Sequence, residues 1–165
     1  MKKRIIFYFI TLMLFCQALP VSAVSKEQEA KIVEGCSGIQ DNLKNLQRAD
    51  AKARVYLGGY YETILSKFIT PLNVRVVENN LSNAGLVENQ NNFADTRTLF
   101  SNDFIAYQQE LEDLVGIDCK SEPGDFYEQL VKVRKKRKVV EQDVLKMRGL
   151  ISGHINLVNK LKGKL

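Results

Sequence analysis

Cysteines are the residues of this 165-residue chain whose type and spacing point most directly to chemistry. Of the three cysteines, Cys16 lies in an apolar N-terminal segment, and only Cys36 and Cys119 lie in the remainder. Two cysteines in an exported chain are expected to pair as a structural crosslink, because exported proteins meet an oxidising environment. We therefore predict a disulfide between Cys36 and Cys119.

Other chemistry has little support in the sequence. The single histidine, His154, falls on an apolar helical stripe, so we expect a residue at the edge of the core with one hydrogen-bond partner. The Glu-x-x-His pairs of di-iron bundles, the Cys-x-x-Cys-His attachment of haem and a serine nucleophile elbow are all missing from the sequence. We expect no catalytic residue, no metal and no cofactor, and hence no enzyme.

A cationic run from 132 to 138 places six positive charges in seven positions. Its candidate contacts for an anionic partner are Lys132, Arg134, Lys135, Lys136 and Lys138. One interpretation is a solvated face, with Glu128 and Glu141 as local partners one helical turn away. The other is contact with an acidic envelope polymer, a lipid headgroup or a protein. Nucleic acid is not an expected partner of an exported protein.

Three charged residues, Asp50, Arg97 and Arg137, interrupt otherwise apolar stripes. Counted along the chain from the two cysteines, Asp50 and Arg137 fall at similar heights. We predict that they form a buried ion pair whose use is to fix the register of two helices. A polar site inside the helical domain is the alternative.

The elements that position these residues follow from long heptad-like stripes of apolar residues, with no strand-like alternation. The stripes predict helices over roughly 37–70, 86–116 and 125–162. Pro71 disfavours helix at the residue before it, and the asparagine-rich stretch Asn79–Asn92 suits a turn. Between them, continuation of Leu72–Leu81 as a kinked helix stays open. Pro123 and Gly124 mark the second connection, after which Asp125 is placed to cap the third helix.

Short connections between long helices make sequential helices antiparallel neighbours. The sequence therefore predicts an all-α fold, an elongated, coiled-coil-like up-down-up three-helix bundle stapled by one disulfide. The cysteines support this topology, because a parallel pair of ~50 Å helices would hold them far beyond the ~7 Å that a disulfide spans. Gly58, Gly59, Gly149 and Gly153 predict either a close approach of the first and third helices or a hinge.

The N-terminus has the features of a secretory leader, namely the cations Lys2 to Arg4, an apolar run and small residues before a cleavage position at Ala23. We expect residues 1–23 to be a signal peptide and 24–165 to be one helical domain; an uncleaved N-terminal membrane anchor is the alternative. Removing three of the 24 Lys and Arg residues leaves 21 against 19 acidic residues, a net charge of +2.

The segments Asn45–Asn80 and Asp125–Lys138 resemble small exported helical proteins of unknown function from ultra-small, reduced-genome bacteria. The resemblance implies export and a helical fold, and it implies no activity. We expect a secreted or periplasmic interaction or scaffold protein that binds a protein or cell-envelope partner. Binding of an anionic envelope lipid or polymer through the cationic run, including peripheral contact with an anionic membrane, stays open. Self-association through Leu150, Ile155 and Leu157 also stays open.

Overall fold

The structure, a computed structural model, describes residues 24–81 and 84–163, so the predicted leader over 1–23 lies outside the described residues. The described chain folds into helices joined by short connections and contains no strand. Its elements are α1 (Lys26–Thr63), a π-helical segment (Ile64–Ile69), α2 (Thr70–Glu78), α3 (Ala84–Gly116) and α4 (Pro123–Lys162). The predicted all-α class is confirmed.

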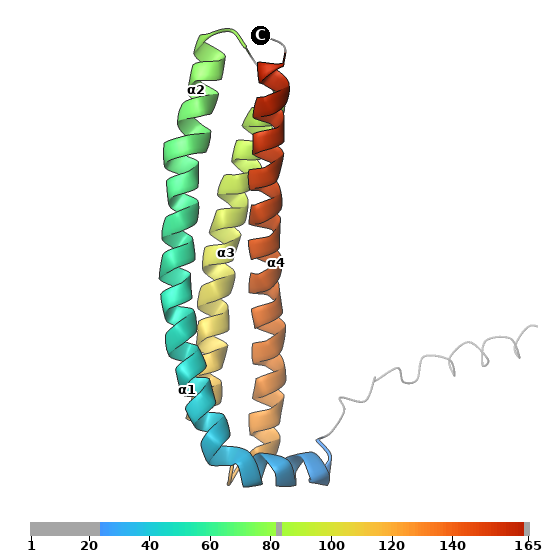
Figure 1. Ribbon diagram of the computed structural model, residues 1–165. Helices are drawn as coiled ribbons and strands as arrows, with labels where there is room; N and C mark the ends of the chain where they lie inside the picture. Colours follow the sequence, from blue (N-terminus) through green and yellow to red (C-terminus); the bar gives the residue numbers. More distant parts are fainter. Residues whose placement is uncertain (1–23, 82–83, 164–165) are drawn as a thin grey trace, which may run out of the picture.

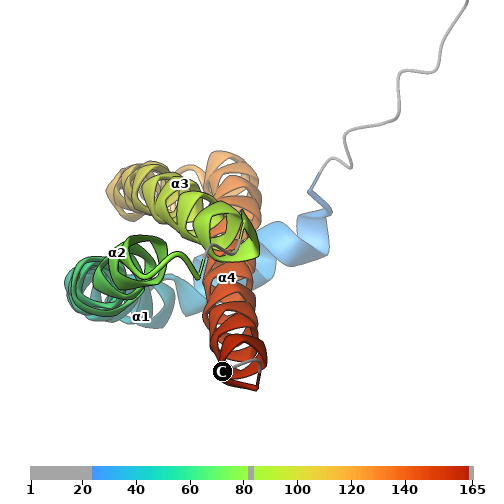
Figure 2. The same cartoon turned by 90° about the horizontal axis from the view of Figure 1, so that it is seen from above.

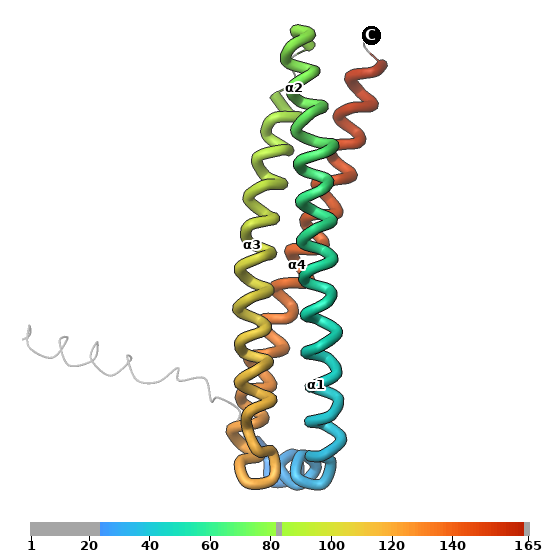
Figure 3. Tube along the Cα trace, turned by 90° about the vertical axis from the view of Figure 1, so that its left-hand side faces the viewer, coloured from blue at the N-terminus to red at the C-terminus, as the bar shows by residue number. Residues whose placement is uncertain are grey.

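The helices form a long bundle (Figure 1). α1, the π-helical segment and α2 make one continuous path, with α3 and α4 beside it. Seen from the end, the three helical stretches lie at the corners of a triangle (Figure 2), and α4 leans away from α2 toward the C-terminus (Figure 3). α3 packs chiefly against α4, whereas α1 meets α4 over a smaller surface. The α3–α4 pair is therefore the best-packed part of the molecule.

α1 begins at Lys26, eleven residues before the helix start predicted from the apolar stripe. Ser25 and Gln28 explain the early start, because each side chain bonds the other's backbone N–H in a capping box. The first part of α1 lies across one end of the bundle before the helix turns along its length (Figure 1). The sequence Cys36-Ser37-Gly38 offers the weak helix formers at which such bends concentrate.

The π-helical segment explains how the helical path passes Pro71, near which the predicted first helix ended. Proline lacks an N–H and its ring collides with the carbonyl four residues earlier in a regular α-helix. Here the ladder widens, and the Thr70 N–H donates to the Leu65 carbonyl five residues back. Pro71 then occupies the first turn of α2, where proline is tolerated.

α2 ends at an asparagine in the left-handed region. Asn80 has φ of 54°, its N–H donates to the Val77 carbonyl, and the next N–H, of Leu81, donates to the Val76 carbonyl. These bonds form a Schellman motif. The predicted turn up to Asn92 is too long, because α3 already begins at Ala84.

Tertiary hydrogen bonds engage the side-chain N–H donors of the buried asparagines Asn73 of α2 and Asn89 of α3. Asn89 donates to the Leu150 carbonyl of α4, and Asn73 of α2 donates to Gln90 Oε1. Amides that bond neighbouring helices do not compete for their own backbone.

α4 also begins earlier than predicted, at Pro123, with Glu122 at the cap position. Asp125 therefore lies in the first helical turn instead of capping the helix, as the sequence had predicted. Proline is favoured at a first helical position because its missing N–H would have had no helical acceptor there.

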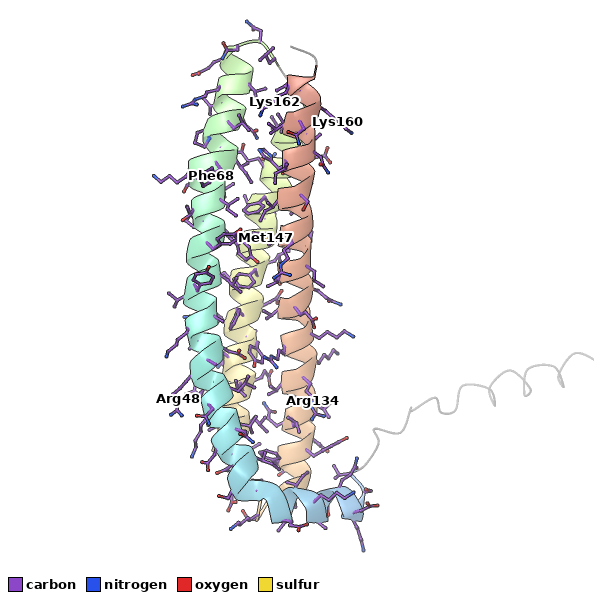
Figure 4. The ribbon with its side chains drawn as sticks, in the orientation of Figure 1. Arg48, Phe68, Arg134, Met147, Lys160 and Lys162 are labelled. Atoms are coloured by element: carbon purple, nitrogen blue, oxygen red, sulfur yellow. A yellow bond between two sulfur atoms is a disulfide. The ribbon has the colours of Figure 1, made fainter. Side chains whose placement is uncertain are left out.

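On α3 and α4 the core follows the predicted stripes, whereas on α1 Tyr60 of the predicted stripe is exposed and Tyr61 is buried. Along α4 the buried positions Val133, Val140, Met147 and His154 repeat every seven residues. Against them α3 buries a row of large side chains: Phe93, Phe100, Phe104, Tyr107, Leu111 and Leu114. Tyr61 of α1 completes this row, with its ring centroid 5.4 Å from that of Phe100 in an edge-to-face contact. Figure 4 shows Met147 between the helices at mid-length.

Candidate functional site

A disulfide joins Cys36 of α1 to Cys119 in the α3–α4 connection, with their Cα atoms 5.6 Å apart, as predicted. Both cysteines are buried. Nearby, the Gln40 side chain donates to the Ile117 carbonyl, so a second link ties α1 to the end of α3. Asp118 orders the connection by accepting from the Lys120 N–H and the Ser121 hydroxyl, and these bonds lower the pKa of its carboxyl.

Asp50 and Arg137 meet between α1 and α4, with Arg137 Nε 3.7 Å from Asp50 Oδ2. The Asp50 side chain is 15% exposed, but that of Arg137 is 56% exposed. The contact therefore lies at the edge of the core, and the prediction of a buried pair needs that correction. The guanidinium stays in water because Arg137 sits beside the buried heptad positions of α4 and not on them.

Tyr107 of α3 is the partner that sequence reasoning missed. Its hydroxyl donates to Asp50 Oδ2 at 2.6 Å, so a single carboxylate links all three long helices. Burial and the bond to Asp50 raise the pKa of Tyr107 well above its ordinary value. The available signal was that Tyr107 carries a hydroxyl on an otherwise apolar stripe at the height of Asp50.

The cationic run, called the basic segment (132–138) from here on, lies on α4 toward the disulfide end. Val133 is buried, Lys136 is half-buried, and Lys132, Arg134, Lys135, Arg137 and Lys138 are exposed. Figure 4 marks Arg134 on this stretch. Apart from the Arg137–Asp50 contact, its cations form no ion pair within residues 24–81 and 84–163. The expected local partners Glu128 and Glu141 therefore do not neutralise it.

Arg97, the third charged residue of the stripes, reaches across to α1 and pairs with Glu62. Its Nε is buried without a hydrogen-bond partner. The Arg97–Glu62 pair resembles the Asp50–Arg137 contact, because in both a charged side chain next to the core pairs with an opposite charge on a neighbouring helix.

The interior contains polar atoms without partners. His154 is buried, and both of its ring nitrogens lack hydrogen-bond partners, so the expected single partner is absent. Burial lowers the pKa of His154. Asp143 of α4 has the opposite shift, since burial and the nearby Asp103 carboxylate raise its pKa. In the folded chain, burial disfavours the charged form of both side chains.

The four helical glycines do not mark a close approach of α1 and α4, which corrects one of the two interpretations. No atom lies within 4 Å of a Cβ built at Gly58, Gly59 or Gly149. A Cβ at Gly153 would lie 3.4 Å from Asn89 Nδ2, so the neighbour there is α3. A distance of 3.4 Å is an ordinary van der Waals contact, so packing does not require glycine at any of the four positions.

Exposed aromatic residues lie along the helical path formed by α1, the π-helical segment and α2. Tyr56 and Tyr60 stack with ring centroids 6.5 Å apart and planes 9° from parallel. Tyr56 is 72% exposed, and Phe68, which Figure 4 marks within the π-helical segment, is 65% exposed. We call Tyr56, Tyr60 and Phe68 the aromatic face. Val74 and Val77 of α2 are also exposed on this helical path.

Within the described chain, no group of three or more His, Cys, Asp and Glu side chains is arranged to hold a metal ion. None of the helices described here has the length and apolar character needed to cross a membrane. Comparison with protein-family models, curated proteins and solved structures finds no match to this chain.

Proposed function

We propose that the protein is an exported interaction or scaffold protein without catalytic activity, and that it binds a protein partner through the aromatic face. The main observation in support of this proposal is that Tyr56, Tyr60 and Phe68 are exposed on one helical path. Aromatic side chains supply much of the binding energy in protein interfaces because they bury large areas at low entropic cost. A π-helical segment inside this path adds support, since such irregularities concentrate at functional sites.

The proposal also covers the fold of the mature protein and its location. We propose an elongated, coiled-coil-like up-down-up three-helix bundle over 24–165, released by cleavage near Ala23 into a secreted or periplasmic space. The Cys36–Cys119 crosslink supports both parts, because it ties two helix ends together and because disulfides persist in oxidising compartments.

The test is capture of a partner from the envelope fraction of the source cell on immobilised protein. A variant with Tyr56→Ser, Tyr60→Ser and Phe68→Ser should retain its helical circular dichroism and lose the captured protein. A control with Glu88→Ser, Asn91→Ser and Asn92→Ser alters three exposed residues of α3 and should capture as the parent does. Equal capture by the aromatic variant and the parent would contradict the proposal.

The basic segment supports a second candidate, binding of an anionic lipid or polymer. Apart from Arg137, its exposed cations form no ion pair within the described residues, and exposed Val131 and Leu145 flank the segment on α4. Cations beside apolar side chains suit an anionic membrane surface. Glutamine at Lys132, Arg134, Lys135 and Lys138 should keep the helix and abolish co-sedimentation with phosphatidylglycerol vesicles at low salt. Unchanged sedimentation would leave the segment as a solvated face.

A further inference from the structure

A cleft of about 450 Å³ opens between α1 and α3, and none of its lining residues belongs to the aromatic face or the basic segment. It is lined by Arg54, Val55, Gly58, Arg97, Thr98, Phe100, Ser101 and Asn102. The lining contains two guanidinium groups and no carboxylate. A cleft with this charge favours an anionic occupant, because its walls repel cations and leave the two arginines facing the same space.

The two arginines retain donors for a ligand. Arg97 pairs with Glu62 through Nη1, so its Nη2 donors are unused by the ion pair, whereas its Nε is buried. Arg54, from the opposite helix, makes no ion pair within the described residues. Guanidinium groups match the geometry of carboxylate and phosphate oxygens, which each accept two parallel bonds from one arginine.

Gly58 provides an independent reason to regard the cleft as a site. Glycine weakens a helix interior relative to alanine, so its presence in α1 calls for a cause. Packing is not the cause, because no atom lies within 4 Å of a Cβ built there. Gly58 instead lines the cleft, and the space around a Cβ built there is open. The glycine therefore keeps the cleft open.

We propose that this cleft binds a small molecule through a phosphate or carboxylate group held between Arg54 and Arg97. Ser101 and Asn102 line the same space and provide further hydrogen-bond donors, whereas the Thr98 hydroxyl already donates to the Ala94 carbonyl. The inference goes beyond the proposed function, because it uses another surface and another kind of ligand.

The experiment titrates the purified, disulfide-bonded protein with glycerol 3-phosphate and, separately, with succinate at constant ionic strength, and follows backbone amide shifts by NMR. We expect saturable shifts at Arg54, Gly58 and Ser101 with at least one of the two probes, and the stronger binder identifies phosphate or carboxylate as the source. Arg54→Gln should weaken binding at least tenfold. Arg48→Gln, a matched loss of an exposed arginine on α1 outside the cleft, should leave binding unchanged.

The Gly58→Leu variant distinguishes a loss of ligand binding at the cleft from a loss of protein stability. Leucine is a better helix former, so the melting temperature should rise by about 2 to 4 °C while binding is lost. The proposal is overturned if neither probe gives saturable shifts, or if Gly58→Leu binds as the parent does. It is also overturned if the four glutamines in the basic segment abolish binding while Arg54→Gln does not.

Discussion

At the scale of single residues, the Asp50 side chain of α1 contacts residues of both α3 and α4. Its carboxylate accepts from the Tyr107 hydroxyl and lies near the Arg137 guanidinium, so residues of three helices meet at one side chain. The two contacts differ in strength. Hydrogen bonds to charged groups contribute about 1.5 to 3 kcal/mol, whereas ion pairs with an exposed partner contribute about 0 to 1 kcal/mol. The hydrogen bond from Tyr107 should therefore contribute more to the free energy of unfolding than the ion pair with Arg137.

Tyr107→Phe should lower the free energy of unfolding by about 1 to 2 kcal/mol, because it removes the hydroxyl and keeps the ring in the core. Arg137→Met should cost less than about 0.5 kcal/mol and should couple weakly to Asp50→Leu in a double-mutant cycle. Urea unfolding followed by circular dichroism measures both. Tyr60→Phe, on an exposed tyrosine, is the control and should change nothing. A larger loss at Arg137 than at Tyr107 would reverse this ranking.

His154 should make the folded state sensitive to acid. Burial depresses its pKa, so the unfolded chain binds a proton more readily than the folded chain as pH falls below the ordinary value of 6.5. The contribution of neutral, buried His154 to stability is therefore complete above pH 6.5, and it is lost as the pH falls through the depressed pKa of the folded chain. Asp143, with a raised pKa, acts in the opposite direction at lower pH.

His154→Leu should flatten the decline in stability below pH 6.5 and add about 1 kcal/mol at pH 7, because it removes two buried nitrogens without partners. The measurement is the urea midpoint across a pH series. Asp143→Asn provides the comparison, since it should raise stability at neutral pH and leave the histidine-dependent decline in place. An unchanged pH profile in His154→Leu would assign the acid sensitivity to other groups.

At the scale of elements, the sequence predicted what depends on periodicity and missed what depends on tertiary bonds. The heptad repeat of α4 and the Cys36–Cys119 disulfide were accessible, because both follow from residue type and spacing. A kinked helix over Leu72–Leu81 was also open from the sequence, but the π-helical segment before Pro71 was not accessible, because a widened π register leaves no mark in apolar spacing. The open space at Gly58 was likewise hidden, since a helical glycine is equally consistent with contact and with a cleft.

The end of α2 gives a prediction at this scale. Asn80 adopts a left-handed conformation that glycine adopts without strain, so Asn80→Gly should stabilise the protein by about 0.5 kcal/mol. Asn80→Ala should destabilise it by about 1 kcal/mol. Asn79, whose φ is −91°, is the matched control, and glycine there should be destabilising. Thermal unfolding of the variants checks the order, and a stabilising Asn80→Ala would contradict the assigned role.

At the scale of the whole molecule, the disulfide should carry much of the stability. It closes a loop with a sequence separation of 83 residues, for which chain entropy predicts about 4 to 5 kcal/mol. α1 packs less extensively on α4 than α3 does, so the crosslink should chiefly hold α1 to the α3–α4 pair.

Replacing Cys36 and Cys119 by serine should therefore lower the free energy of unfolding by about 4 kcal/mol and expose the amides of α1 first. Hydrogen exchange resolves the order, with α1 amides exchanging before those of α4. The parent protein after reduction with dithiothreitol serves as an independent comparison. A loss below about 1 kcal/mol, or uniform exchange in all helices, would show that packing alone holds α1 in place.

The central claim is that the protein acts by binding a partner through the aromatic face, and photocrosslinking in the living source cell tests it most directly. Benzoylphenylalanine placed at Tyr60 should give a discrete crosslinked product after export, and Tyr56→Ser in the same chain should reduce that product strongly. Benzoylphenylalanine at Asn91, an exposed position on α3, should give no such product. The account is contradicted if position 60 yields no adduct, or if positions 60 and 91 yield the same adducts in equal amounts.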